Sequence, residues 1–316
     1  MEMVVWSRRS TGKTTKIKRR YKMGLGLTNR LKSIVLVIVA AAILSSCSFV
    51  ENEGLMQVHF IDVGQGDSTL IMSPDGKTML IDAGDNSAGD VVANYLKKRG
   101  VSTIDILVGT HPDADHIGGL DTIIDSFEIV DFYMPRKSHT TNTFLDVLNA
   151  AKRNGLKVKE AKAGVDFKLG SEVKGKFLNP RSTYSDDNNL WSAVARLEYS
   201  DKSFLFMGDA EVQNELEILG AGENIDSDLI KLGHHGSSTS SSEEFIKAVS
   251  PDVAVISAKL KNSYGHPHKE TLELLKAQSI LIYRTDEQGS IAFYCDGKKI
   301  WADKKQGTYN YYGEGK

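Results

Sequence analysis

Strand-like and helix-like segments alternate along residues 55–303, and this alternation limits the fold more than any other feature of the sequence. Hairpins of apolar strands are followed by strand–helix units, and this order of elements occurs twice. Tight turns such as Pro74-Asp75-Gly76 favour antiparallel pairing, while a helix between two strands favours parallel pairing. The pattern therefore predicts an α/β protein in which two mixed sheets pack together with helices outside. The expected strands are 56–62, 68–73, 78–82, 104–109, 193–199, 203–207, 229–232, 253–257, 280–283 and 290–295, and the expected helices are 90–99, 143–154, 211–219, 242–249 and 269–277.

The charge of the chain is unevenly distributed, although the composition is that of a globular protein, with 41% hydrophobic and 25% charged residues. Residues 1–46 hold ten Lys or Arg and one acidic residue, which leaves 29 basic and 40 acidic residues in 47–316, a net charge of −11. A body this acidic excludes a general basic surface for nucleic-acid binding, and the 8% aromatic content offers no stacking groove for single strands. Any phosphate must be gripped at a local site, for which a bound cation is the obvious device.

The N-terminus predicts a lipoprotein signal peptide. The apolar run 34–44 has basic residues before it and is short for a membrane span, which needs roughly 20 residues. It ends in Leu44-Ser45-Ser46-Cys47, which resembles the bacterial lipobox, so we expect a signal peptide at 1–46 and a lipid anchor on Cys47 at the outer side of the cell membrane. The alternatives are an uncleaved anchor with an incidental cysteine, and a true start at Met23. We further expect a linker at 47–54, one domain at 55–303 and a polar tail at 304–316.

The densest polar motif is His111-Pro112-Asp113-Ala114-Asp115-His116, which directly follows the strand expected at 104–109. Two His and two carboxylates at this spacing can serve two adjacent cations, one pair each. Charged groups packed beside a buried strand are costly unless something neutralises them. The motif therefore predicts a metal site, and the alternative is a solvated polar loop.

Three further strands are followed by potential ligands. The stretches after them are Gly208-Asp209, Gly233-His234-His235-Gly236 and Tyr264-Gly265-His266-Pro267-His268. Each taken alone is equally consistent with an ordinary turn or with isolated surface and core residues. Six of the eight histidines, however, lie in the three histidine-bearing clusters, which favours one shared site.

The order of these motifs resembles the metallo-β-lactamase superfamily, and most closely the β-lactamase-like domain at the C-terminus of the ComEC family of competence DNA-channel proteins. The matching stretches are HFIDVGQGDS at 59–68, LIDAG at 80–84, HPDADHIGG at 111–119, LFMGDAE at 205–211, LGHHGSS at 232–238 and YGHPH at 264–268. The resemblance implies an αβ/βα four-layer sandwich with a metal site at the sheet edges. Teichoic-acid phosphorylcholine esterases share a similar site.

The resemblance also implies a set of ligands for two divalent ions, Zn²⁺ or Mn²⁺. Carried over by position, these are His111 and Asp113 for the first metal, Asp115 and His116 for the second, Asp209 as a bridge between them, and His234 or His235 to complete the second. The usual third His of the first metal is missing, because no His lies between 139 and 234. We expect Asn188, Asn189 or Ser192 to fill in through water. Carboxylate and neutral oxygen ligands favour Mn²⁺ over Zn²⁺.

Other polar residues are candidates for the reaction itself. Two adjacent cations can activate water and neutralise a phosphoryl oxygen. Besides Asp115, the candidate catalytic residues are His266 and His268, either to protonate a leaving group or to hold a phosphate. Candidates for orienting a ligand or contacting phosphate are Asp62, Asp67, Asp82, Ser192, Lys231 and Arg284.

Three functions are compatible with these motifs. The favoured one is a secreted, lipid-anchored, metal-dependent hydrolase, a phosphodiesterase or nuclease that acts on DNA. The alternatives are a cell-surface ester hydrolase, similar to a phosphorylcholine esterase or a lactonase, and a non-catalytic accessory of competence or DNA uptake. The sequence does not identify a protein partner.

Overall fold

The structure is a computed structural model that describes residues 54–185 and 187–312. The signal peptide, the lipidated Cys47 and almost all of the linker lie outside these residues and stay predictions. Among the helices of the described ranges, none is both long and apolar enough to cross a membrane.

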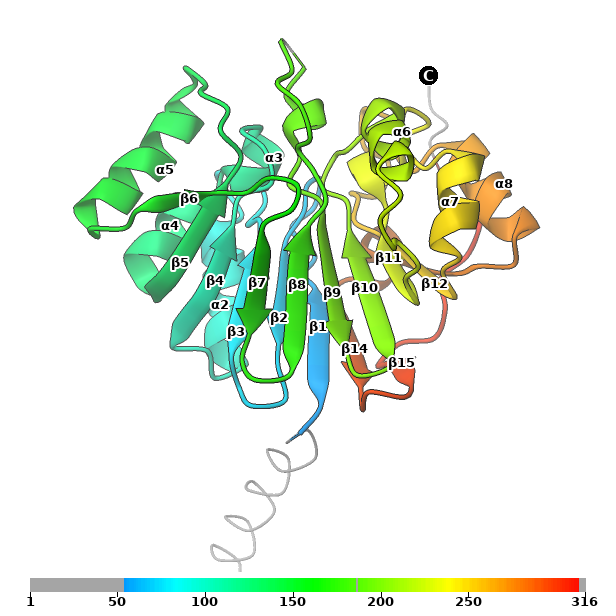
Figure 1. The fold of residues 1–316 in the computed structure, drawn as a ribbon, viewed down its shortest axis with the longest axis horizontal. Helices are drawn as coiled ribbons and strands as arrows, with labels where there is room; N and C mark the ends of the chain where they lie inside the picture. The colour runs from blue at the N-terminus through cyan, green and yellow to red at the C-terminus, as the bar shows by residue number, and fades with distance from the viewer. Residues whose placement is uncertain (1–53, 186, 313–316) are drawn as a thin grey trace, which may run out of the picture. The chain divides into compact units, whose positions relative to one another are not determined.

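Two mixed sheets lie face to face (Figure 1). The first has the order β15 (Ile300–Ala302), β14 (Ile291–Cys295), β1 (Met56–Phe60), β2 (Thr69–Met72), β3 (Thr78–Ile81), β4 (Thr103–Val108), β5 (Glu128–Met134), β6 (Val158–Glu160). The second has the order β13 (Leu281–Arg284), β12 (Val253–Ile256), β11 (Leu229–Lys231), β10 (Lys202–Phe206), β9 (Ala195–Tyr199), β8 (Val173–Phe177), β7 (Asp166–Leu169). Each sheet changes from antiparallel to parallel pairing, at β3–β4 in the first and at β10–β11 in the second. This is the hairpin-then-crossover order that the sequence predicts.

Helices cover the outer face of each sheet (Figure 1). The first sheet carries α2 (Gly89–Lys98), α4 (Leu120–Ser126) and α5 (Asn142–Arg153), and the second carries α6 (Val212–Gly220), α7 (Glu243–Val249) and α8 (Lys269–Ala277). Short helical turns complete the described chain, namely α3 (Ala114–Ile117), α9 (Thr285–Gln288), η1 (Asn189–Trp191) and η2 (Gly233–Gly236). A third apolar layer, with Phe60, Phe206 and Phe293 at its centre, lies between the sheets. The predicted four-layer αβ/βα sandwich is confirmed.

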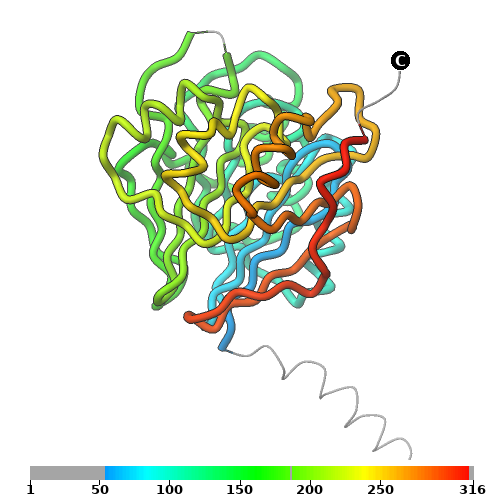
Figure 2. Tube along the Cα trace, turned by 90° about the vertical axis from the view of Figure 1, so that its right-hand side faces the viewer, coloured from blue at the N-terminus to red at the C-terminus, as the bar shows by residue number. Residues whose placement is uncertain are grey.

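The C-terminal segment differs from the expected polar tail. It runs back along β13 and α8 (Figure 2), and Gly307 donates its N–H to the Ile282 carbonyl at 2.7 Å. The Tyr309 hydroxyl donates to the Ile280 carbonyl at 2.6 Å, and its ring packs on the core beneath the helices. Three tyrosines in 304–316 supply the apolar surface for this packing, which a count of polar residues overlooks.

The carboxyl ends of the parallel strands meet at one edge of the sandwich. Strands β3 and β4 run in the same direction in one sheet, and β10, β11 and β12 do so in the other. The residues that follow these strands therefore gather at the upper edge in Figure 1, near α3. This edge contains the polar motifs.

Candidate metal centre

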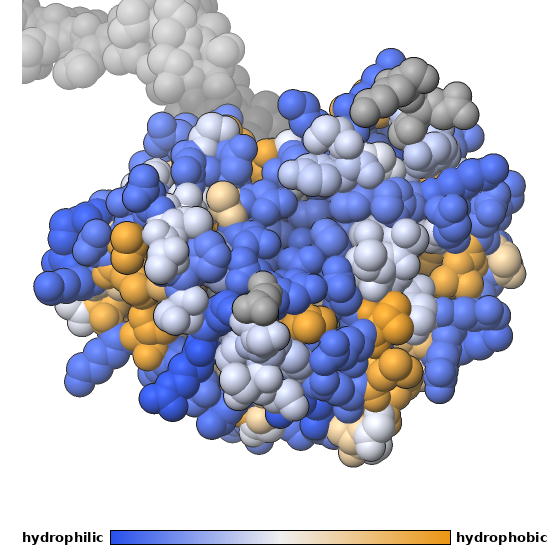
Figure 3. All heavy atoms as spheres, turned by 90° about the horizontal axis from the view of Figure 1, so that it is seen from above, coloured by the Kyte–Doolittle hydropathy of each residue, from blue (hydrophilic) through white to orange (hydrophobic). Residues whose placement is uncertain are grey.

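Four strand-end side chains form a buried cluster at this edge. His111, His116, Asp209 and His235 are each at most 3% exposed. They come from the loop after β4, from α3, from the turn after β10 and from η2, so both sheets contribute. Figure 3 looks down on this face, which is largely hydrophilic. Four ionisable groups that are this deeply buried need a partner that balances them.

The ligands expected for the second metal lie close together. His116 Nε2 is 3.1 Å from Asp209 Oδ1, and His235 Nε2 is 3.3 Å from Asp115 Oδ2 and 3.5 Å from Asp209 Oδ2. Three elements thus direct nitrogen and oxygen donors to one point. Of the two histidines left open by the sequence, His235 is the one that faces Asp115.

The ligands expected for the first metal are more widely spaced. His111 Nε2 is 3.6 Å from Asp113 Oδ2 and 4.0 Å from Asp209 Oδ2. His234 Nε2 is 3.9 Å from the same Asp209 oxygen. This oxygen also faces His235, so we propose, from its distance alone, that His234 contributes to the first metal, which the sequence left without a third histidine.

Donor atoms that make no hydrogen bond and meet only as ion pairs indicate that this cluster fits a metal. Within the described residues, Nε2 of His111, His116 and His235 and Oδ1 of Asp209 are buried and make no hydrogen bond. Imidazole nitrogens and carboxylate oxygens are the donors that Zn²⁺ and Mn²⁺ take in proteins. One or two cations at this point would satisfy all four atoms.

The other ring nitrogens are held from behind. Asp82 accepts hydrogen bonds from the Thr110 N–H at 2.8 Å and the Thr110 hydroxyl at 2.7 Å, and its Oδ2 lies 2.8 Å from His116 Nδ1. The Ser192 hydroxyl accepts from the Asp209 N–H at 3.0 Å and is 3.4 Å from His111 Nδ1. Such contacts fix a ring so that its Nε2 faces a metal.

His235 Nδ1 donates to the Ser257 carbonyl at 3.1 Å, and Asp67 faces the same nitrogen. Gly66 has φ of 129°, and a Cβ there would lie 2.2 Å from the Asp115 carbonyl, so glycine allows this turn to approach α3. Asp67, His116, Asp209 and His235 offer donor atoms within 4.8 Å of one another. However, Asp67 Oδ1 faces His235 Nδ1 at 3.3 Å, and Oδ2 pairs with the buried Lys231 ammonium at 2.7 Å. A carboxylate already neutralised by lysine is better placed to orient His235 than to bind the cation.

Acidic and imidazole groups alternate in the cluster and shift one another's protonation. Burial alone lowers the pKa of His235, but the carboxylates of Asp209 and Asp67 outweigh it and raise that pKa to about 9. Burial also opposes the charged form of His116, yet Asp209 and Asp82 raise its pKa well above the ordinary value. Burial disfavours the ionised form of Asp209 too, but the imidazoles hold its pKa well below the usual range. Asp209 is therefore ionised at neutral pH, as a metal ligand must be.

Two adjacent histidines adopt a strained backbone. His234 and His235 have φ of 47° and 54°, in the left-handed region that non-glycine residues seldom occupy. Each such residue costs of order 1–3 kcal/mol, and such strain is concentrated at functional sites. This conformation lets both consecutive side chains approach Asp209, which an extended strand could not do because its side chains alternate.

His266 lies beside the cluster. Its ring centroid is 5.2 Å from that of His234, and the exposed Tyr264 ring stacks on it at 5.7 Å. Burial, followed by the positive charge of His235, lowers the pKa of His266 to about 3. A ring that is neutral at pH 7 favours the second of its two expected roles, that of holding a phosphate.

His268 is committed to the surrounding loop. Its Nδ1 accepts from the Ser238 N–H at 2.9 Å, and its Nε2 lies 3.2 Å from the Tyr264 carbonyl. Both ring nitrogens therefore have partners within the protein, so His268 positions the loop that carries His266.

Two of the sequence candidates lie apart from the cluster. Asp62 is exposed and accepts from the Gly64 N–H at 3.1 Å, which closes a turn. Arg284 is fully buried and bound to Asp286, so the expectation that it contacts phosphate is corrected: its guanidinium has no access to a substrate. Lys231 likewise lies beneath the site, where its ammonium pairs with Asp67.

Asn188 and Asn189, two of the expected substitutes for the missing histidine, bind carboxylates next to the cluster. Asn188 donates to Asp113 Oδ1 at 2.7 Å, while Asn189 donates to Glu211 Oε1 at 3.3 Å. Sequence reasoning missed Glu211, which is 3.3 Å from His234 Nδ1, and Thr110. Their signal was their position, next to or two residues from a ligand in the matching stretches.

The family model of the Metallo-beta-lactamase superfamily matches residues 61–258, which include every side chain of the buried cluster. The chain belongs to the metallo-β-lactamase superfamily, whose members are generally metal-dependent hydrolases.

Three curated relatives are ComEC-family competence proteins, which confirms the resemblance noted in the sequence. The chain is 32% identical to ComE operon protein 3 of Bacillus subtilis, with 75% of this chain and 33% of the relative covered. It is 30% identical to Recombination protein 2 of Haemophilus influenzae (74% and 28% covered) and 31% identical to Competence protein ComA of Neisseria gonorrhoeae (77% and 32% covered). The chain thus spans about a third of the length of these relatives.

Among solved structures, a variant of the CmlA beta-hydroxylase is similar, with a TM-score of 0.51 and 12% identity over 75% of this chain and 53% of that one. At this level of identity the likeness shows the shared fold alone.

Proposed function

We propose that the protein is a metal-dependent phosphodiesterase, a nuclease that acts on DNA. The observation that carries the proposal is the set of buried, unpartnered donor atoms on His111, His116, His235 and Asp209. The competence proteins among its relatives favour DNA as the phosphodiester. The acidic body favours a cation as the means of gripping phosphate, since like charges would otherwise repel.

In this proposal each side chain has a defined task. Two divalent ions bound here supply Lewis acidity that activates water and neutralises phosphoryl oxygens. Asp115, His116 and His235 would hold one ion, the histidine and carboxylate of the HPD motif would hold the other, and Asp209 would serve both. Asp82, Ser192 and Asp67 keep the rings in place from behind.

His266 then contacts the substrate. Its Nδ1 is buried without a hydrogen-bond partner among the described residues, and its ring is neutral at pH 7 because of burial and the nearby imidazoles, which lower its pKa. A neutral imidazole carries one N–H, which can donate to a phosphate oxygen. Tyr264, stacked on the same ring, limits how far His266 can turn.

The test is metal analysis coupled to a substrate screen. The full chain is assayed against bis-p-nitrophenyl phosphate, single- and double-stranded DNA, RNA and choline phosphate esters, each with Mn²⁺ and with Zn²⁺. We expect bound metal and cleavage of phosphodiesters, with DNA among them. Cleavage of choline esters alone would support the esterase alternative, and bound metal with no cleavage would support a non-catalytic accessory of DNA uptake.

We also propose that the chain is anchored outside the cell membrane through Cys47, on the strength of the lipobox-like motif in the sequence. Cys47→Ser should abolish labelling by a fatty-acid probe and release the protein from membranes. Unchanged membrane retention, with no label in the parent protein, would contradict the anchor.

A further inference from the structure

A cavity of about 430 Å³ opens between the loops that follow β5, β6 and β8. Its charged lining consists of three cations, Arg136, Lys162 and Arg181, and one acid, Glu160. The Trp191 ring forms part of its wall. The volume lies within the range of about 300–1,000 Å³ that small-ligand pockets occupy. We call this feature the cationic cavity; it is notable because residues 47–316 carry a net charge of −11.

One loop runs from the cationic cavity to the metal centre. Trp191 is followed directly by Ser192, whose hydroxyl accepts from the Asp209 N–H at 3.0 Å. In the same loop, Asn188 donates to Asp113 Oδ1 at 2.7 Å. Lys137, next to Arg136, donates to the Ser185 carbonyl at 2.8 Å and so ties the β5 loop to this one. One loop therefore carries both a residue that lines the cavity and residues that contact ligands expected at the metal centre.

Of the three cations of the cavity, Arg181 pairs with Glu223, whereas Arg136 and Lys162 are available to a ligand. Arg136 is exposed, and its side chain has no ion pair or hydrogen bond within the described ranges of the chain. Lys162 pairs only with Glu160, at 3.1 Å, and both side chains are more than a third exposed. Exposed pairs of this kind contribute little, so a phosphate can replace the carboxylate at small cost.

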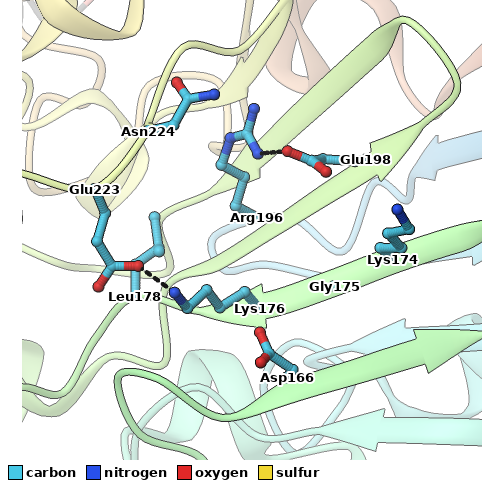
Figure 4. A pocket seen from close by; sticks show the side chains of 9 residues that line it. All are labelled: Asp166, Lys174, Gly175, Lys176, Leu178, Arg196, Glu198, Glu223 and Asn224. Carbon is cyan, nitrogen blue, oxygen red and sulfur yellow. Dashed lines mark hydrogen bonds and ion pairs between the residues drawn. The ribbon is translucent and has the colours of Figure 1, made fainter.

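A neighbouring pocket provides a contrast (Figure 4). It has about 260 Å³ and is lined by three cations and three acids. Two of its cations are neutralised, since Lys176 pairs with Glu223 at 2.6 Å and Arg196 pairs with Glu198. The difference lies in the lining acids, since this pocket has three and the cationic cavity has one.

We propose that the cationic cavity binds a backbone phosphate of a single DNA strand, next to the phosphodiester that lies at the metal centre. The inference deepens the proposed function and rests on it for the identity of the strand. Two separate anion sites call for a substrate with at least two phosphates, which a polymer provides and a small diester does not.

The test compares binding with hydrolysis of a small substrate. A labelled phosphorothioate oligo-dT is titrated with the full chain in Mn²⁺, and fluorescence anisotropy is measured over a range of salt. For R136A/K162A we expect about tenfold weaker binding and a salt slope smaller by about 0.7, since the contact with one single-strand phosphate is lost. The kcat/KM for bis-p-nitrophenyl phosphate, which has one phosphate, should not change.

The matched control is Lys174→Ala, which removes one exposed charge from the pocket in Figure 4. It should leave the salt slope unchanged. The inference is overturned if R136A/K162A binds like the parent, if Lys174→Ala weakens binding as much, or if the parent protein does not bind the strand. If the parent binds but cleaves no diester, the proposed function fails and the binding site stands.

Discussion

The molecule contains two buried clusters of charged side chains that differ in how completely they are satisfied. In the first, around Arg284, every polar group has a partner in the protein. Its guanidinium binds Asp286 through two hydrogen bonds of 2.9 and 2.6 Å and donates to the carbonyls of Thr308 at 3.1 Å and Asn310 at 2.6 Å. This cluster needs nothing from outside, and it fastens the C-terminal segment to β13.

The second cluster, at the metal centre, is as deeply buried but is not complete. Its histidines are held from behind through Nδ1, while their Nε2 atoms and Asp209 Oδ1 remain without hydrogen bonds among the described residues. Leaving a buried polar atom unpaired costs about 1–3 kcal/mol. The comparison teaches that completeness, and not burial or charge, separates a structural cluster from one built for a ligand.

The largest expected effect follows from removing the bridge of the incomplete cluster. Asp209→Asn should lower the bound metal and reduce hydrolysis of bis-p-nitrophenyl phosphate by several orders of magnitude, because Asp209 faces both metal positions. Metal analysis and initial rates measure this. The matched control is Asp286→Asn in the complete cluster, which should keep the parental metal content. Parental metal and rate in Asp209→Asn would show that this carboxylate is not a ligand.

Substitutions in the complete cluster should change the stability of the protein and not its metal content. Arg284→Ala leaves Asp286 buried without its partner, which typically costs about 3–5 kcal/mol. Urea unfolding measures the loss. Should that variant fail to fold, Arg284→Lys serves, because it keeps the charge but loses the two-pronged contact and should be destabilised less. A metal content per folded molecule that drops in Arg284→Lys would contradict the separation of the two clusters.

Added metal should stabilise the protein only when the incomplete cluster can bind it. At a metal concentration a hundredfold above Kd, a ligand that binds the folded state alone adds about 2.7 kcal/mol. We expect the Tm of the chelator-treated parent protein to rise on adding Mn²⁺, with the same shift in Arg284→Lys and almost none in Asp209→Asn. Equal shifts in all three proteins would indicate binding elsewhere.

Much of the fold could be predicted because its signals are local. Apolar strands that end in polar residues, as at Val108 and Phe206, mark both sheets and the edge where the site lies. Arg284 was misassigned because its neighbours in sequence give no sign that residues 308–310 return to cover it. Strands β5 to β8 and β15 and helix α4 were missed. In β6 and β8, exposed lysines such as Lys159 and Lys174 interrupt a short apolar pattern.

The residues that form the site were predicted better than their arrangement. Spacing alone could not distinguish His234 from His235, because the outcome depends on two left-handed residues in succession. In the structure they point to different partners, His235 to Asp115 and His234 to Glu211 and Asp209. Backbone strain of this kind opposes local preference, so a sequence pattern does not reveal it.

The smallest expected effect concerns a difference within the incomplete cluster itself. Each expected metal position has a half-exposed carboxylate, Asp115 at 35% and Asp113 at 38%, and the positions differ in their late histidine, since the side chain of His235 is 2% exposed and that of His234 is 24% exposed. Water competes better for an exposed position, so the first should bind metal more weakly. Titrating Mn²⁺ into metal-free protein should therefore give two calorimetric steps, with activity appearing mainly in the second step.

Single substitutions assign the two steps. His235→Ala or His116→Ala should remove the tighter step, because each deletes a buried donor, while His234→Ala should weaken only the later one. Losing a ligand should cost more than the roughly 10–100-fold seen when a residue behind a ligand is changed. Asp113→His should shift the weaker position toward Zn²⁺, since imidazole suits zinc and carboxylate suits manganese. Two equal steps, or a His234→Ala variant that loses the tighter one, would mean that exposure does not rank the positions and that His234 belongs to the second metal.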